Sequence, residues 1–382
     1  MVKEAGGGHP GCARRAPMDE RGTMTAVDER FMARALELAR AVPRPSPNPR
    51  VGAVVVRDGA IVAEAAHEGP GRPHAESAAL GGIDAIGCTL YVTLEPCSHQ
   101  GRTPPCAPEV AQAGIRRVVA AMEDPDGRVQ GRGFAMLRAA GVEVSVGVLA
   151  PEAAALNSAW VHERLTGRAR VTLKLALSLD GRLAAADGSA RWITGAAARA
   201  HVHTRRAEAD GIVVGAGTVA ADDPQLSARG SSNVRQPARV IVDSLGRTPG
   251  FARVFAAGAQ VIVATTERCS HETQMAWKET GAEVVVLPAG PEGVDLGALV
   301  SELSRREWLE IYCEGGARLA SSLLRERVVD RLELYYGSVL LGSGPGVAVP
   351  GIDSMDRALR FTLVEARRFE DDVLVILERG DR

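Results

Sequence analysis

The chain has 382 residues, of which 46% are hydrophobic and 24% charged, and its formal net charge is −2. At roughly 150 residues per domain this length favours two domains, and the near-neutral charge gives no reason to expect nucleic acid or a membrane surface as a partner. Six cysteines without a secretory signal favour reduced thiols or metal ligands over disulfides. No apolar run is long enough to span a bilayer, so the expected location is the cytoplasm.

The first half of the chain predicts a domain over residues 25–168, preceded by a disordered extension at 1–24 that lacks helical or strand periodicity. Its first helix is expected from Asp28 to Arg40, and four prolines follow within the stretch VPRPSPNPR. The runs VGAVVV and IVAEAAH flank Asp58-Gly59 and predict a hairpin. Beyond the hairpin we expect a helix near 75–80 and a strand near 89–93, then a helix, a strand near 116–122, a helix near 133–141 and a strand near 142–149. One continuous helix is expected over 151–164.

A second domain is expected over residues 169–382, after a boundary near Thr166-Gly167-Arg168. Apolar strands alternate with helical patterns here, which favours an α/β fold with a mostly buried, largely parallel sheet. The expected strands are VTLKLALS, GIVVG, ARVIVD, QVIVAT, AEVVVLP, EIYC, LELYYGSVLLG and DDVLVILE. The expected helices cover residues 196–206 and 296–306, and a third ends at Arg325.

Residues of the first domain predict a zinc site. His74 and Glu76 open a helix, and Cys97 and Cys106 follow the strand TLYVT. One imidazole and two thiolates give zinc three protein ligands and leave a fourth position for water, which is typical of a catalytic site. Zinc lowers the pKa of such a water, and Glu76 can take its proton and pass it to leaving ammonia. The pattern is that of a zinc-dependent hydrolytic deaminase with one ion per chain and Glu76 as the catalytic residue.

Two alternatives stay open for this site. The zinc could be purely structural, in which case Glu76 would have no catalytic role. His99, which lies in the loop between the two cysteines, could also compete as a ligand. Cys88 is expected to be a core thiol, and the remaining cysteines, including Cys12, have no partner spacing.

The second domain contains two candidate ligand-binding features. Lys174 interrupts an apolar strand, where an ammonium needs a partner or a ligand, unless its side chain extends to solvent at the strand end. Glu314-Gly315-Gly316 lies between a strand and a helix, and glycines at a helix N-terminus let backbone N–H groups approach a phosphate. The run GAGTVA (215–220) fits a dinucleotide-binding pattern only weakly, because no first βαβ unit surrounds it.

Both halves resemble the RibD family, the bifunctional deaminase/reductases of riboflavin biosynthesis. The matching stretches include PNPRVG, PHAE, TLEPCSHQGRTPPC, KLALSLDGR, RWITG, TVAADDPQL and EGGARLASSLL. The resemblance implies a cytidine-deaminase-like α/β/α sandwich followed by a dihydrofolate-reductase-like α/β domain. It also implies zinc-dependent deamination of 2,5-diamino-6-(5-phosphoribosylamino)pyrimidin-4-one and then NADPH-dependent reduction of the ribosyl unit to a ribityl chain.

Individual site residues also follow from this resemblance. The residues expected to line NADPH are Ala176, Trp192, Thr218, Asp222, Ser244 and Gly316, with the loop as far as Ser322. Those expected to bind substrate are Asn48, Lys174, Arg206, Leu226, Arg229 and Glu314. Read from the residues alone, Asn48 would be a turn residue and Arg206 part of a solvated helix face. Lys174 and Asp180 are candidate acids for the reduction.

The chain departs from the family pattern at two places. Ala190 replaces a usual serine, and Ala317-Arg318 replaces a usual Pro-Thr. The rival interpretations are a deaminase whose second domain only binds a nucleotide, and a deaminase of nucleosides or tRNA bases. A small-molecule substrate and a homo-oligomer are expected, although no residue pattern fixes the number of subunits.

Overall fold

The structure is a computed structural model that describes residues 26–43, 46–101, 103–230 and 235–380. The extension expected at 1–24 and Cys12 lie outside the described residues. Residue contacts divide the chain into two compact units. The first consists of 26–42 with Arg50–Ser158, and the second of Pro43–Pro49 with Ala159–Arg382. Among the described residues, no helix has the length and apolar character to cross a membrane.

The first unit is built on a five-stranded sheet with the order β2-β1-β3-β4-β5. Its strands are β1 (Gly52–Arg57), β2 (Ala60–Ala66), β3 (Thr89–Val92), β4 (Arg117–Ala120) and β5 (Glu143–Val146). The expected hairpin is confirmed: β1 and β2 pair antiparallel around Asp58-Gly59. β3, β4 and β5 run parallel, so their carboxyl ends lie at one edge of the sheet.

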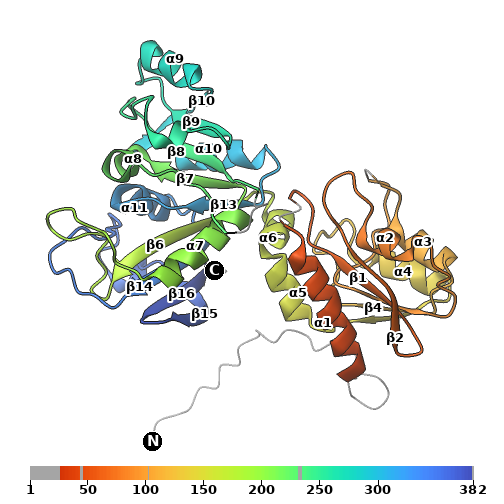
Figure 1. Cartoon of the computed structure of the whole chain (residues 1–382). Helices are drawn as coiled ribbons and strands as arrows, with labels where there is room; N and C mark the ends of the chain where they lie inside the picture. Colours follow the sequence, from red (N-terminus) through yellow and green to blue (C-terminus); the bar gives the residue numbers. More distant parts are fainter. Residues whose placement is uncertain (1–25, 44–45, 102, 231–234, 381–382) are drawn as a thin grey trace, which may run out of the picture. The chain divides into compact units, whose positions relative to one another are not determined.

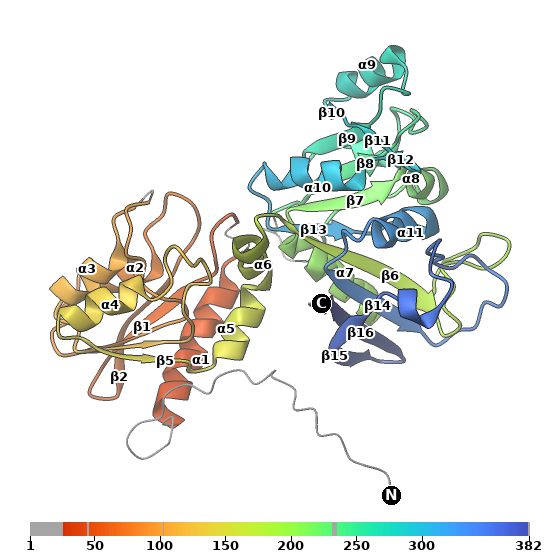
Figure 2. The same ribbon diagram turned by 180° about the vertical axis from the view of Figure 1, so that it is seen from behind.

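Helices cover both faces of this sheet (Figures 1 and 2), as in the expected three-layer sandwich. One face holds α1 (Ala26–Ala41) and α5 (Ala150–Leu156), and the other holds α2 (Ala75–Leu80), α3 (Cys106–Gln112) and α4 (Arg132–Ala139). Phe31 and Met32 of α1 pack in the core against Val54 of β1. Gly52 permits the close approach of α1, since a Cβ there would lie 2.0 Å from the Ala35 carbonyl oxygen.

The prediction of a single helix over 151–164 is wrong in one respect. The helix is interrupted at Asn157, which separates α5 from α6 (Ser158–Thr166). The Asn157 side chain accepts a hydrogen bond from the Arg50 backbone N–H (2.8 Å) and donates one to the Arg50 carbonyl oxygen (2.9 Å). Asparagine competes for backbone hydrogen bonds in this way, which disfavours helix interiors. The partner is more than a hundred residues away, so helical periodicity could not reveal it.

A nine-stranded sheet forms the second unit, in the order β10-β9-β8-β7-β13-β6-β14-β16-β15. The strands of this unit are β6 (Arg170–Ser178), β7 (Gly211–Gly215), β8 (Ala238–Val242), β9 (Val261–Thr265), β10 (Glu283–Val286), β13 (Glu310–Cys313), β14 (Arg331–Gly337), β15 (Phe361–Phe369) and β16 (Asp372–Arg379), with a small separate hairpin of β11 (Ala289–Gly290) and β12 (Gly293–Val294). The expected parallel sheet is confirmed as far as β14, and β16 and β15 then add antiparallel.

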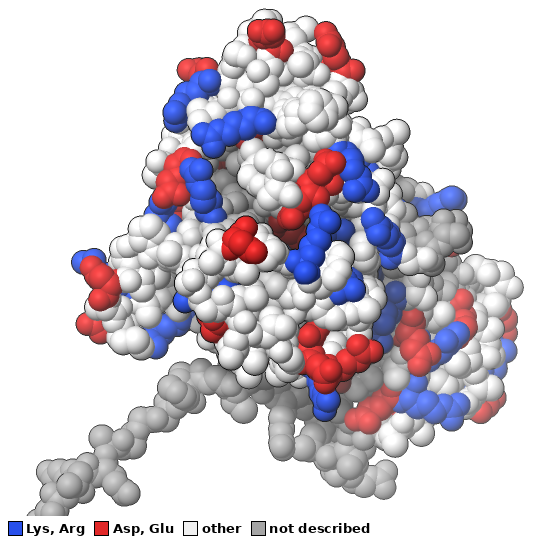
Figure 3. Space-filling view, turned by 60° about the vertical axis from the view of Figure 1, so that its left-hand side comes forward, with Lys and Arg blue, Asp and Glu red and all other residues white. Residues whose placement is uncertain are grey.

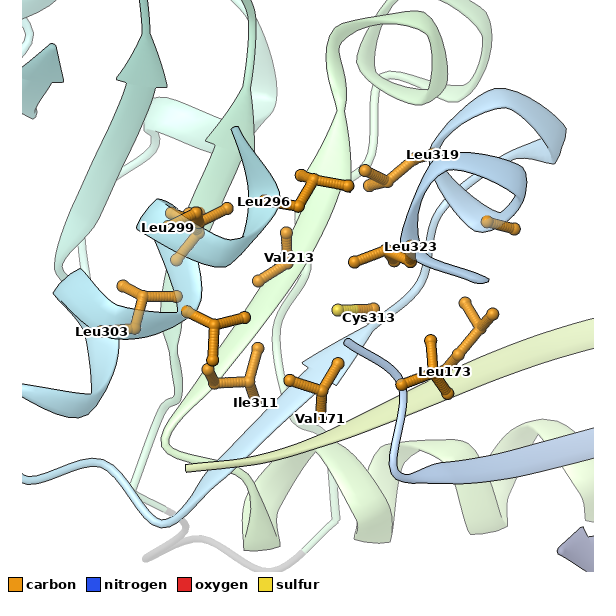
Figure 4. Close-up of a cluster of buried hydrophobic side chains, with 14 of the residues drawn as sticks. Val171, Leu173, Val213, Leu296, Leu299, Leu303, Ile311, Cys313, Leu319 and Leu323 are labelled. Atoms are coloured by element: carbon orange, nitrogen blue, oxygen red, sulfur yellow. The ribbon is translucent and has the colours of Figure 1, made fainter. Parts of the chain in front are cut away.

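The second unit contains nearly all of α6, followed by the helices α7 (Ala196–Glu208), α8 (Ala216–Asp222), α9 (His271–Glu279), α10 (Leu296–Ser304) and α11 (Ala317–Arg325), with short 3₁₀ turns at η1 (Arg253–Phe255) and η2 (Met355–Arg357). Figure 4 shows leucines of α10 and α11 directed at Val213, Ile311 and Val171 on the neighbouring strands. Alternate residues of the same strands face α7 instead, where Val202 packs near Tyr312 and Tyr335. The sheet is therefore covered on both faces, which explains its apolar strands.

Strand β15 had no counterpart among the sequence expectations. Most of its side chains are exposed, and it forms the edge of the sheet beside β16. An exposed edge strand buries little apolar surface and therefore leaves a weak alternating pattern in the sequence. On the face seen in Figure 3, acidic and basic side chains of the described residues are interspersed, in keeping with the near-neutral net charge.

Candidate functional site

Three candidate metal ligands of the first unit lie close together, as expected. His74 is the N-cap residue of α2, Cys97 lies in the loop after β3, and Cys106 is the first residue of α3. Their donor atoms all lie within 4.8 Å of one another. Two sulfurs and one imidazole nitrogen suit zinc, which prefers tetrahedral nitrogen and sulfur ligands, and three protein ligands leave one position for water.

The imidazole of His74 has a defined orientation. Its Nδ1 lies 3.2 Å from the Cys106 Sγ and 3.5 Å from the Cys97 Sγ, so Nδ1 is the atom that could bind the metal. Its Nε2 lies 3.0 Å from the hydroxyl oxygen of Thr103. A hydrogen bond at the second ring nitrogen fixes the tautomer and the orientation of a metal-binding histidine.

The two thiols have opposite protonation tendencies in the metal-free geometry. Hydrogen bonding from Cys106, together with the nearby His74 ring, lowers the pKa of Cys97 to about 4. The Cys106 pKa is raised, first because its thiol donates to the Cys97 sulfur and second because it is buried. His74 has a raised pKa through its hydrogen bond with Cys97. The surroundings of Cys97 therefore favour its thiolate form, which is the form that binds metal.

Glu76 lies on α2 two residues after His74, and only 4% of its surface is exposed. Burial raises the pKa of its carboxyl group to about 7. A group that titrates near neutrality can both accept and release a proton at working pH. The geometry therefore places a proton-transfer group beside the three candidate metal ligands.

The other predicted candidates of this region have different outcomes. His99 is exposed and does not belong to the cluster of potential metal ligands found among the described residues. Cys88 is fully buried, which confirms the expected core thiol. Asn48 is half-buried in a bend of the Pro43–Pro49 segment, and its role as a pyrimidine contact stays a prediction.

Two supporting side chains near the metal ligands were not singled out from the sequence. Thr103 is the first, through its contact with His74. Ser77 is the second: its hydroxyl donates to a Glu109 carboxylate oxygen at 2.5 Å and lies 3.9 Å from the Cys106 Sγ. Threonine and serine in a helix start or a proline-rich loop are common, so the sequence carried no specific signal for them.

A second cluster lies in the second unit, where Lys174, Arg206 and Glu314 come together from β6, α7 and the end of β13. The guanidinium of Arg206 donates to both carboxylate oxygens of Glu314, at 2.5 and 3.0 Å. The Lys174 Nζ lies 3.8 Å from the same carboxylate and 5.9 Å from the centre of the Tyr335 ring. Arg206 is therefore not part of a solvated helix face, and Lys174 does not extend freely to solvent.

The charges of this cluster compensate one another. Burial would raise the pKa of Glu314, but Arg206 and Lys174 outweigh it and lower the value to about 2. Burial lowers the pKa of Lys174, against the attraction of Glu314. Only about a tenth of the Glu314 side chain is exposed. A polar substrate that enters this site would meet two cations already oriented by one carboxylate.

The candidate cofactor residues lie on the strands and helices around the carboxyl ends of β6, β7, β8 and β13. The backbone N–H of Gly316, the N-cap of α11, donates to the Thr218 hydroxyl at 3.1 Å, so these two predicted residues are neighbours. A Cβ on Gly315 would lie 2.9 Å from the Leu319 side chain, so glycine is required for this tight strand-to-helix turn. The first N–H groups of an α-helix have no partner within the helix, and the N-terminus of a nine-residue helix such as α11 therefore suits a dinucleotide phosphate.

The remaining cofactor candidates are more spread out. Ala176 is half-buried on β6, Asp222 ends α8, and Ser244 accepts a hydrogen bond from the Val294 backbone N–H at 2.9 Å. Trp192 is 67% exposed, and the Arg199 guanidinium lies 4.4 Å from its ring centre. The Arg191 guanidinium also lies over this ring, at 6.0 Å from its centre.

Three further candidates differ in their surroundings. Leu226 is buried with a φ of 51°, and Arg229 is exposed nearby in the same loop. Asp180 accepts hydrogen bonds from the Ser178 hydroxyl and from the backbone N–H groups of Leu341 and Gly342. The bond from Ser178 and those from the backbone lower the pKa of Asp180 to about 2. Asp180 is therefore a poor proton donor at neutral pH and holds two loops together.

Comparisons with known proteins match both units. A family model for the cytidine and deoxycytidylate deaminase zinc-binding region matches residues 25–122. A model for the RibD C-terminal domain matches residues 169–375. The riboflavin biosynthesis protein RibD of Escherichia coli is 40% identical over 367 residues, which cover 92% of this chain and 99% of the relative. RibD of Aquifex aeolicus is 38% identical over 356 residues, with the same two shares, 92% and 99%.

Solved structures give the same result over most of the chain. RibD of Acinetobacter baumannii has a TM-score of 0.81 at 37% identity, covering 93% of this chain and 99% of that one. A Thermotoga maritima protein described as a diaminohydroxyphosphoribosylaminopyrimidine deaminase and 5-amino-6-(5-phosphoribosylamino)uracil reductase has a TM-score of 0.81 at 35% identity, with coverage of 93% and 99%. The similarity therefore extends over both units.

Proposed function

The chain belongs to the RibD family of bifunctional deaminase/reductases in riboflavin biosynthesis, and on this premise we propose a role for each of its two sites. The first unit deaminates 2,5-diamino-6-(5-phosphoribosylamino)pyrimidin-4-one by hydrolysis. The second unit then reduces the ribosyl unit of the product with NADPH.

In the first unit, His74, Cys97 and Cys106 hold one zinc ion per chain, through Nδ1 and the two Sγ atoms. Zinc supplies Lewis acidity that makes water a nucleophile near neutral pH. Glu76 accepts a proton from the attacking water at its carboxylate and delivers it to the departing amine. Its burial supports this role, because a carboxyl group with a pKa of about 7 exchanges protons readily at neutral pH.

In the second unit, Thr218 and Gly316 hold the NADPH phosphates, and Ala176, Trp192, Asp222 and Ser244 line the rest of the cofactor. NADPH supplies the hydride, so the protein contributes position and charge. Lys174, Arg206 and Glu314 bind the substrate, with Leu226 and Arg229 from the adjoining loop. Lys174 is the candidate proton donor for the opening sugar ring, because its lowered pKa eases release of a proton.

The observation that carries the deaminase proposal is the orientation of His74, whose Nδ1 faces both cysteine sulfurs while Glu76 is buried on the same short helix. A purely structural zinc site would be closed by a fourth protein ligand, and the cluster among the described residues contains three. Asn48 would contact the pyrimidine, and a homo-oligomer is the expected assembly.

A two-stage assay in one tube tests the proposal. Purified protein with zinc and the diaminopyrimidine substrate is expected to release ammonia, and NADPH added afterwards is expected to be oxidised, with loss of absorbance at its reduced-nicotinamide band. Cytidine is the control substrate for the first stage. Ammonia release without NADPH oxidation would contradict the reductase role, and equally fast release from cytidine would contradict the substrate assignment.

A further inference from the structure

Glu95 is a buried carboxylate in the segment that carries Cys97, and the proposed reaction gives it no role. It lies two residues before Cys97, and 4% of its surface is exposed. A carboxylate out of contact with water is costly unless its oxygens accept hydrogen bonds. The hydrogen-bond partners of the Glu95 carboxylate therefore indicate its structural role.

Four backbone N–H groups from a different part of the chain donate to this carboxylate. Oε2 accepts from Asp124 at 3.1 Å and from Gly131 at 2.9 Å. Oε1 accepts from Gly133 at 2.9 Å and from Phe134 at 3.4 Å. Gly133 and Phe134 belong to the first turn of α4, where N–H groups have no partner within the helix. The N-cap residue Gly131 has no side chain to serve them, so Glu95 caps α4 from outside.

Gly133, in the first turn of α4, lies too close to the Pro96 segment for any residue larger than glycine. A Cβ on Gly133 would lie 1.9 Å from the Pro96 carbonyl oxygen and 3.2 Å from the Glu95 Oε1. The start of α4 therefore packs directly against the peptide group that joins Pro96 to Cys97. Figures 1 and 2 show α3 and α4 side by side on the same face of the sheet.

Cys97 is held from its other side by α3. The backbone N–H of Ala107 donates to the Cys97 carbonyl oxygen at 3.0 Å, and that of Cys106 donates to the Cys97 Sγ at 3.3 Å. Cys97 itself lies in a loop without helix or strand hydrogen bonds. Its position is thus fixed between the start of α3 on one side and, through Glu95, the start of α4 on the other.

We propose that Glu95 is a positioning residue of the deamination site, which clamps the Cys97 segment to α4 and to the 124–131 loop and so aims the Cys97 Sγ at the metal position. The inference rests on the zinc site proposed above. This arrangement requires both carboxylate oxygens to be hydrogen-bond acceptors, because each oxygen accepts from two backbone N–H groups. Glutamine has the same shape but would turn an NH₂ group toward two of those donors.

The test compares Glu95→Gln with the unaltered full-length protein, each loaded with cobalt(II) in place of zinc. Absorption from cobalt–thiolate bonds reports the Cys97 sulfur directly and needs no substrate. We expect this band to shift and weaken in the variant. Metal affinity and the kcat of deamination should each fall by about 10- to 100-fold, as for other residues that support metal ligands. NADPH oxidation by the second unit, measured with already deaminated substrate, should stay unchanged.

Two further variants make the result decisive. Gly133→Ala keeps all four N–H donors but pushes on Pro96, and it should change the cobalt band in the same way. Asp243→Asn is the matched control, because Asp243 is a buried carboxylate in the second unit that accepts backbone N–H bonds from Leu245, Gly246 and Thr248. It should leave the cobalt band and the deamination rate unaltered.

An unaltered cobalt band in Glu95→Gln would overturn the positioning role, whatever happens to the activity. If Glu95→Gln fails to fold, Gly133→Ala decides, and an unaltered band there would overturn the role as well. Failure of the proposed function gives a different result, because the unaltered protein would then bind cobalt through thiolates without releasing ammonia.

Discussion

The Nδ1 of His74 and the Sγ of Cys106 lie 3.2 Å apart, although 32 residues separate them in the chain. The contact joins the starts of two helices, α2 and α3, that cover the same face of the sheet. Because both helices begin at these residues, small shifts of either helix would move a candidate metal ligand. The site therefore depends on helix packing as well as on the identity of its ligands.

Replacement of Glu76 by glutamine is expected to abolish deamination while zinc stays bound. The amide cannot carry the proton from water to the leaving amine, which should lower kcat by about 10²- to 10⁴-fold. Ammonia release and metal content are measured on the same sample, and NADPH oxidation by the second unit with already deaminated substrate is the control. Full deaminase activity in the variant would point to a purely structural metal.

Thr103→Val should weaken metal binding by about 10-fold, since the His74 ring loses the hydrogen-bond partner of its Nε2. Competition with a coloured chelator measures the affinity. Thr103→Ser keeps the hydroxyl and serves as the matched control, for which near-normal affinity is expected. Equal affinities of the valine and serine variants would mean that the Thr103 hydroxyl does not orient the ring.

Removal of the metal by a chelator should separate the two activities. All three candidate ligands belong to the first unit, whereas the Lys174 cluster belongs to the second. Deamination should therefore be lost and restored by added zinc, while the reduction of already deaminated substrate continues at its original rate. A parallel loss of NADPH oxidation would show that the second unit also depends on the metal.

Glu314→Gln should destabilise the second unit in a pH-dependent way. The folded state lowers the pKa of Glu314 from 4.5 to about 2, so as the pH falls the unfolded chain is protonated first. The stabilising effect of the carboxylate is complete above pH 4.5 and disappears as the pH falls through 2. Removing one partner of such a buried ion pair lowers the free energy of unfolding by about 3 kcal/mol near neutral pH.

Denaturant unfolding at several pH values measures this effect. The difference in unfolding free energy between the unaltered protein and Glu314→Gln should be largest at neutral pH and shrink between pH 4.5 and 2. Glu279→Gln, at an exposed position of α9, is the control and should change little at any pH. A difference that stays constant across this range would contradict the ionic role of Glu314.

The sequence by itself determined the chemistry of the first site and the class of the fold. His74, Glu76, Cys97 and Cys106 are identifiable because ligand types, spacing and the strand before Cys97 are all local features. The parallel strands of the second unit were predictable for a similar reason, since a strand buried on both faces must be apolar throughout. Helix α2 and the β1–β2 hairpin were likewise expected from short-range signals.

Only the tertiary structure decided the features that depend on distant partners. The break at Asn157, the contact of Thr103 with His74 and the four N–H groups around Glu95 each join residues far apart in the chain. The pairing of Arg206 with Glu314 is another case, because an arginine on a helix has the same local pattern whether it faces solvent or a buried carboxylate. Hydrogen bonds between separate elements leave no periodicity in the sequence, and so the ligands could be predicted while the residues that orient them could not.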